Sequence, residues 1–176
     1  MYRCTFIACL LILACNNQPA ATKNTSATNK KQYYPYSPLY QTDFTKGDEA
    51  KANTVLNIWK GYESGNFSSY LAHFAEDVTM VFENDRFTDK KDIAVEKLRV
   101  RRKHITTTQI HVEYWQPVFM PRLQEHWVFI WGRFEGTIRR NDLESWNIHQ
   151  VWKFNKDGKI YFMQEYKSRF EWSKPD

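Results

Sequence analysis

The sequence has only three cysteines in 176 residues, and all of them precede position 16, at Cys4, Cys9 and Cys15. The rest of the chain therefore has no thiol for a disulfide, a thiolate zinc site or a cysteine nucleophile. Its core must be held together by packing alone.

Long apolar runs are also missing. The run from Phe6 to Leu13 is too short for a membrane span, which needs about 20 apolar residues. It follows Arg3 and has the zones of a secretory signal. The ending Ile12-Leu13-Ala14-Cys15 resembles the lipobox of bacterial lipoproteins. That resemblance implies a signal peptide over 1–15, a lipid on Cys15 that anchors the protein in the membrane, and a location in the bacterial cell envelope. Asn16 favours the outer membrane, facing the periplasm or the surface; the alternative is an ordinary signal cleaved after Cys15.

A strong charge of one sign is absent, since the formal net charge is only +5. This small excess argues against a specialist in polyanions, and we expect no nucleic-acid partner. The basic stretch from Lys90 to His104 reads as the solvated face of a helix. The histidines show no metal-ligand spacing, so we predict neither a metal site nor a cofactor.

Residues 16–42 contain little to bury and read as a flexible tether. Its last part, Tyr33 to Tyr40, is a Tyr/Pro arm that we expect to lie along the domain surface and cover part of the core. The other interpretation is a proline-rich ligand for a partner domain. Residues 43–176 form one domain.

Within that domain helices come first and strands follow. Thr45 or Asp48 caps a first helix that Gly65 ends, Asn66 caps a short second helix, and Asp89 caps a third one. The β-branched and aromatic stretches 78–82, 106–116, 126–137, 145–154 and 159–170 then read as strands, the last two joined by Asn155-Lys156-Asp157-Gly158. The class is α+β.

Two blocks carry a resemblance to a known family: Gly65-Asn66 with Phe74-Ala75-Glu76-Asp77, and the hairpin from Phe154 to Ile160. With their spacing and order, the chain resembles the SnoaL-like group of the nuclear transport factor 2-like superfamily. The resemblance implies a cone: three N-terminal helices packed on a strongly curved, mainly antiparallel sheet around one pocket. It also implies a homodimer through the outer sheet face, where we expect Val151, Phe162 and Tyr166.

Ketosteroid isomerases of this superfamily use three polar positions. Matched to this sequence, the general base falls on Phe82, the oxyanion-hole tyrosine on Ile58 and the oxyanion-hole acid on Gln150. Proton abstraction beside a carbonyl needs a base within hydrogen-bond reach. Because these residues are an aromatic, an aliphatic and an amide, we expect no catalysis of that type.

Gln150 is the only polar residue in the alternating face 146–154. It either orients a ligand or bonds a neighbouring side chain. A four-residue hairpin loop pairs it with Met163 and puts Glu165 diagonally beside it. Glu165 then either enters the pocket as a candidate acid or base, or forms a surface ion pair with Lys167 or Arg133. The sequence does not decide which sheet face lines the pocket.

The sequence thus predicts a membrane-tethered extracytoplasmic domain that binds a small apolar or aromatic molecule in an internal pocket. The expected lining is Trp59, Tyr62, Phe82, Gln150, Trp152, Met163 and Glu165. One alternative is a cofactor-free isomerase, cyclase or hydratase with Glu165 or His126 as its catalytic residue. Another is a non-catalytic assembly module with a vestigial pocket.

Overall fold

The computed structural model describes residues 35–36, 43–138 and 142–169. Contacts divide the chain into two units, Met1–Ser37 and Pro38–Asp176, and every helix and strand described belongs to the second. The predicted signal peptide, Cys15 and nearly all of the tether lie outside the described residues. No helix in the described ranges has the length and hydropathy of a membrane span.

The first helix, α1 (Glu49–Ser64), has the ends that the sequence predicts. The Asp48 side chain accepts a hydrogen bond from the Ala50 N–H at 2.9 Å and caps the start. Gly65 ends the helix with φ of 74°, a left-handed conformation that glycine adopts without a Cβ clash. The buried face carries Ile58 and Trp59, two of the residues that reach the site described below.

The other two helices differ in detail from the prediction. The short α2 (Tyr70–His73) begins after Ser69, and Asn66 instead holds the preceding turn by accepting from the Ser68 N–H. The helix α3 (Lys91–Arg102) begins after Lys90, so Asp89 is not its cap. Asp89 belongs to a strand and binds Lys97 of α3 at 2.7 Å.

The sheet has seven strands in the order β1-β4-β5-β6-β7-β2-β3. All neighbours are antiparallel except β7 and β2. The bounds are β1 Thr45–Lys46, β2 Phe74–Phe82, β3 Asp85–Lys90, β4 Ile105–Met120, β5 Glu125–Ile138, β6 Asp142–Phe154 and β7 Ile160–Ser168. The α+β class is therefore confirmed, whereas the sequence reading missed β1 and β3.

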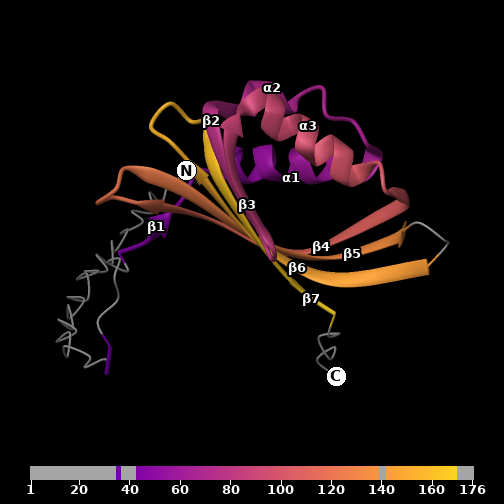
Figure 1. The fold of residues 1–176 in the computed structure, drawn as a ribbon. Helices are drawn as coiled ribbons and strands as arrows, with labels where there is room; N and C mark the ends of the chain where they lie inside the picture. The colour runs from indigo at the N-terminus through magenta and orange to yellow at the C-terminus, as the bar shows by residue number, and fades with distance from the viewer. Residues whose placement is uncertain (1–34, 37–42, 139–141, 170–176) are drawn as a thin grey trace, which may run out of the picture. The chain divides into compact units, whose positions relative to one another are not determined.

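The three helices lie together over one face of the strongly curved sheet (Figure 1). We call this the inner face and the opposite one the outer face. The core lies between helices and inner face, where α1, α2 and α3 bury apolar side chains against alternate residues of β2, β5, β6 and β7. The largest fully buried members are Tyr70, Phe154, Met80, Ile130, Ile160 and Met163.

The register of β6 and β7 differs from the prediction. Gln150 pairs with Glu165, and Trp152 pairs with Met163, two residues further along β7 than a four-residue hairpin loop would give. One residue of this shift comes from the loop, since Phe154 pairs with Ile160, and the other comes from an irregularity between Lys153 and Phe154. Glu165 is consequently the direct cross-strand neighbour of Gln150, not a diagonal one.

The outer face carries a row of aromatic rings that crosses four strands. Tyr114 lies against Trp131, Trp131 stacks on His149 with 4.3 Å between ring centroids, and His149 stacks on Tyr166 at 5.8 Å. Burial lowers the pKa of His149. Both ends of the row are exposed, Tyr114 by 53% and Tyr166 by 52%. The row therefore forms a larger continuous apolar surface than one isolated aromatic residue would.

Candidate functional site

A cavity of about 400 Å³ lies between the helices and the inner face. All seven predicted lining residues contribute to its wall: Trp59, Tyr62, Phe82, Gln150, Trp152, Met163 and Glu165. The inner face, with the even-numbered residues of β6, is therefore the pocket side. His126, the other catalytic candidate, is not part of the wall; its ring packs against Phe119 at 4.7 Å instead.

Gln150 is the centre of a hydrogen-bond network in the cavity wall. Its Oε1 accepts from the indole Nε1 of Trp59 at 2.6 Å and from that of Trp152 at 3.0 Å. Its Nε2 donates to Oε2 of Glu165 at 2.7 Å. Gln150 is only 8% exposed, so these bonds are made away from bulk water.

The two tryptophans fix which way the amide points. An indole N–H is a donor only, so the amide oxygen must face both rings and the amide nitrogen must face Glu165. Oε2 of Glu165 is thereby engaged, and Glu165 itself lies in the cavity wall. This part of the wall thus places a carboxyl group among aromatic side chains, an arrangement typical of small-molecule sites.

Desolvation raises the pKa of Glu165 above its ordinary value of 4.5. The hydrogen bond from Gln150 and the charges of Lys167 and Arg101 act in the opposite direction. Burial, and then the negative charge of Glu165, raise the pKa of Tyr62 to about 12. The site therefore favours the protonated forms of both groups.

Trp59 can reach Gln150 because Gly132 leaves no side chain on the sheet where the indole lies. A Cβ on Gly132 of β5 would come within 2.7 Å of the Trp59 ring and 2.6 Å of the His111 carbonyl oxygen. Only glycine leaves that space free. Tyr70 donates its hydroxyl to the Ile58 carbonyl and so ties the same turn of α1 to α2.

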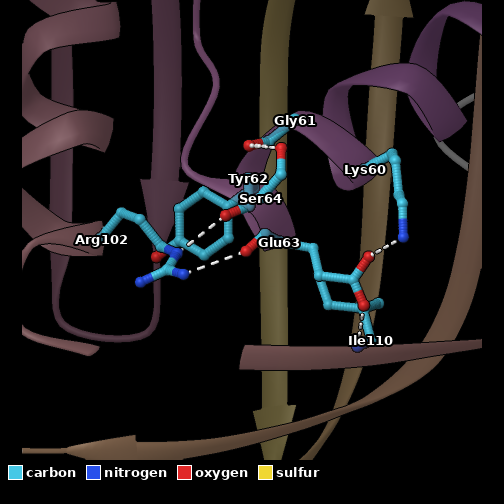
Figure 2. Close-up of polar contacts among 7 residues, drawn as sticks. All are labelled: Lys60, Gly61, Tyr62, Glu63, Ser64, Arg102 and Ile110. Atoms are coloured by element: carbon cyan, nitrogen blue, oxygen red, sulfur yellow. Dashed lines mark hydrogen bonds and ion pairs between the residues drawn. The ribbon is translucent and has the colours of Figure 1, made fainter. Parts of the chain in front are cut away.

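Tyr62 is held by polar contacts at the end of α1, which Figure 2 shows. Arg102 donates from Nε to the Tyr62 carbonyl at 2.8 Å and from Nη2 to the Glu63 carbonyl at 3.0 Å. Its Nη1 binds the Ile105 carbonyl. These carbonyls are among those that a helix end or a strand start leaves unpaired. One side chain therefore links α1, α3 and β4 beside the cavity.

Glu63 fastens the same helix end to the sheet. Its Oε1 accepts from the Ile110 N–H at 3.0 Å while Oε2 binds Lys60 (Figure 2). The Lys60 contact is the largest cause that lowers the pKa of Glu63. A charged carboxylate on a strand-edge N–H is a strong contact, so the Tyr62 backbone has little freedom.

The three ketosteroid-isomerase positions hold no acid in this cavity. Phe82 and Ile58 are part of the wall, and the guanidinium of Arg101 lies 4.0 Å from the Phe82 ring centroid. The nearby Asp85 pairs with Arg101 at 2.5 Å and is not a wall residue. The only wall carboxylates among the described residues are Glu165 and Glu144.

The wall also contains three charged residues and a histidine that were not predicted as lining: Arg101, Glu144, Lys167 and His104. Lys167 shares its strand face with Met163 and Glu165, so alternation along β7 could have identified it. It is not an ion-pair partner of Glu165; its Nζ lies 4.0 Å from the Trp146 ring centroid. Arg133, the other predicted partner, contacts Glu135 at 3.0 Å. Within the described ranges, no three His, Cys, Asp or Glu side chains are grouped to hold a metal ion.

No family model and no curated protein matches this sequence. Solved structures do match its fold. A candidate SnoaL-like polyketide cyclase from Jannaschia sp. CCS1 aligns with TM-score 0.56 and 11% identity over 77% of this chain and 92% of its own. An LEH-like epoxide hydrolase from M. tuberculosis gives 0.55 and 12% over 68% and 84%. A nuclear transport factor 2-like protein of unknown function from Burkholderia pseudomallei gives 0.55 and 13% over 68% and 91%. The chain therefore has the nuclear transport factor 2-like fold, as its sequence predicts; identities this low carry the fold alone.

Proposed function

We propose that this domain binds a small, largely apolar or aromatic molecule in the inner cavity. The observation that carries the proposal is the Gln150 network, which holds the carboxyl group of Glu165 in a part of the wall that is mainly aromatic and aliphatic. The ligand's polar group would bind Glu165, while Trp59 and Met163 contact its apolar body. A volume of about 400 Å³ is in the range of small-molecule pockets, which favours binding over a module with a vestigial pocket.

Native mass spectrometry of the protein purified from its own host tests this proposal. A retained small molecule that is lost from a Met163→Trp variant, in which the larger ring fills the cavity, is the expected result. An empty wild-type protein, together with no thermal stabilisation by any member of an apolar and aromatic compound library, would refute it.

A second candidate function is cofactor-free acid–base catalysis by Glu165. The raised pKa of this residue and its place in the cavity wall favour it, because a general acid or base works best with a pKa near the working pH. In deuterated water, a catalytic Glu165 would exchange carbon-bound protons of the retained molecule, and Glu165→Gln would stop that exchange. Bound ligand without exchange would leave the binding function alone.

The proposed setting is the bacterial cell envelope, where a lipid on Cys15 would tether the domain to the outer membrane. We also propose that the outer face forms a homodimer. The aromatic row through Trp131 and His149 supports this proposal, as do the neighbouring Val151, Phe162 and Tyr166 on the same face.

A further inference from the structure

The end of the cavity wall away from Gln150 contains a second polar region. On β6, Trp146 lies on the inner face four residues before Gln150, a separation of about 13 Å along an extended strand. Its indole nitrogen is buried and has no hydrogen-bond partner among the described residues. A buried indole N–H that lacks an acceptor is destabilising, so an acceptor from a ligand would be favourable there.

Positive charge lies over the ring of Trp146. The Nζ of Lys167 is 4.0 Å from the Trp146 ring centroid, and the Arg169 guanidinium is 4.9 Å from it. Lys167 forms no ion pair with a carboxylate of the described residues, and its own side chain is exposed at the rim. We call Trp146, Lys167 and Arg169 the donor pole, because all three offer only hydrogen-bond donors.

One opposite charge is present. Glu144 lies two residues before Trp146 in the wall, and its Oε2 is buried without a partner in the described part of the chain. The carboxylate of Glu144 balances one of the two positive charges of Lys167 and Arg169, so one positive charge remains in excess. A cationic guest at this end would meet Lys167 and Arg169, whereas an anionic guest would gain the Trp146 N–H and both charges.

We propose that the ligand is an elongated apolar acid whose carboxylate binds the donor pole and whose apolar body extends toward Glu165. This inference rests on the proposed binding function and names its ligand class. The body would lie along Ile148 and Trp152, the wall residues on either side of Gln150, and a second polar group at its far end would bind the carboxyl group of Glu165 as proposed above. A neutral chain of equal length would fill the same space but leave the Trp146 N–H without an acceptor.

Three probes of one chain length separate the possibilities: decanoic acid, decanol and decylamine. Their binding is measured at neutral pH by titration calorimetry on the full-length chain with Cys15→Ser, so that no detergent competes for the cavity. We expect the acid to bind at least about tenfold more tightly than the alcohol, because a charge-assisted hydrogen bond is worth about 1.5–3 kcal/mol. The amine should bind most weakly.

Two lysines of the same sheet provide a matched pair of variants. Lys167→Met removes the inner-face charge and should lower the affinity for decanoic acid about tenfold while leaving decanol unchanged. Lys153 also lies over a tryptophan, 3.9 Å from the Trp127 ring centroid, but it is not a wall residue. Lys153→Met should change neither affinity. Trp146→Phe keeps an aromatic ring and loses the N–H, so it should weaken the acid alone.

The results distinguish this inference from the proposed binding function on which it rests. Equal binding of acid and alcohol, an equal loss with Lys153→Met, or preferred binding of the amine would overturn the acid assignment while the apolar cavity stands. Failure of all three probes to bind would overturn the acid assignment, whereas the binding function is refuted only by the empty wild-type protein and the negative compound library described above.

Discussion

Replacing Gln150 by leucine tests the wall network directly. The substitution leaves the indole N–H groups of Trp59 and Trp152 and one oxygen of Glu165 without their partner. A buried donor that loses its acceptor costs about 1–3 kcal/mol. Two such donors, less what water in the cavity and the apolar leucine recover, give a loss of about 2–4 kcal/mol in the free energy of unfolding.

Urea unfolding followed by tryptophan fluorescence measures this loss. Gln164→Leu is the matched control: Gln164 lies on the neighbouring strand, pairs with Val151, and its side chain forms no hydrogen bond with another described residue. We expect the control to stay within about 0.5 kcal/mol of the wild type, as surface substitutions usually do. If Gln150→Leu were as stable as the wild type, the three bonds would contribute nothing and Gln150 could not orient Glu165.

A double-mutant cycle gives the sharper form of the same test. Trp59→Phe removes one indole donor and keeps a ring against Gly132. If Trp59 and Gln150 interact as observed, the double variant should lose less than the sum of the two single losses, by about 0.5–3 kcal/mol. Additive losses would refute the interaction.

Four more predictions follow from the same structure and sequence. Glu165 holds its proton more tightly in the folded wild type than in the unfolded chain, because burial raises its pKa. Its contribution to stability is therefore fully present below the ordinary pKa of 4.5. That contribution is lost as the pH rises through the raised pKa of the folded state. Glu165→Gln should therefore gain stability relative to wild type as pH increases, and parallel melting curves across pH would contradict this. Arg102→Ala should lower the free energy of unfolding by about 1–3 kcal/mol, because three carbonyls lose a partly buried charged donor. The control Arg99→Ala removes an exposed ion pair and should cost about 0–1 kcal/mol. Similar losses in both variants would show that the Arg102 contacts between α1, α3 and β4 add no stability. Cys15→Ser should move the protein from the detergent phase to the soluble fraction, and a wild type that is already soluble would refute the lipid anchor. Sedimentation should show a wild-type dimer that Phe162→Asp shifts toward monomer, and a wild-type monomer at tens of micromolar would refute the interface.

The fold was predictable because several sequence signals agree. Asp48 and Gly65 mark both ends of α1, and the Asp157-Gly158 turn marks the last hairpin. Alternation in β6 and β7 also groups Gln150 with Trp152 and Met163 with Glu165, but both faces of these strands carry aromatic residues, so the sequence did not decide which face lines the cavity. The helix ends, the turn and these groupings depend on local chemistry that the sequence itself displays.

Features that depend on tertiary packing were not predictable. Ile93 fits the apolar periodicity of α3 yet is 47% exposed, while Ala94 is fully buried, because contact with β2 and β3 determines which side of the helix is covered. Neither the length of the last hairpin loop nor the irregularity between Lys153 and Phe154 has a sequence signature, so the pairing of Gln150 with Glu165 was missed. The orientation of the amide follows from two indoles, one of which lies 91 residues away in the chain.

The position of the acid explains why Gln150 and Glu165 are not interchangeable. A carboxyl group at position 150 would accept from both indoles, and hydrogen bonds to the charged form lower a pKa. The amide takes those two donors on its oxygen and gives Glu165 only one, so desolvation remains the largest influence on that carboxyl group and its pKa stays raised. Gln150 itself lowers the pKa of Glu165 through its hydrogen bond, and burial, which has the larger effect, is what keeps that pKa above its ordinary value. Glu165→Gln separates the two proposed functions on this basis: it keeps an acceptor oxygen for Gln150 and the shape of the wall, so ligand binding should survive, whereas any proton exchange should cease.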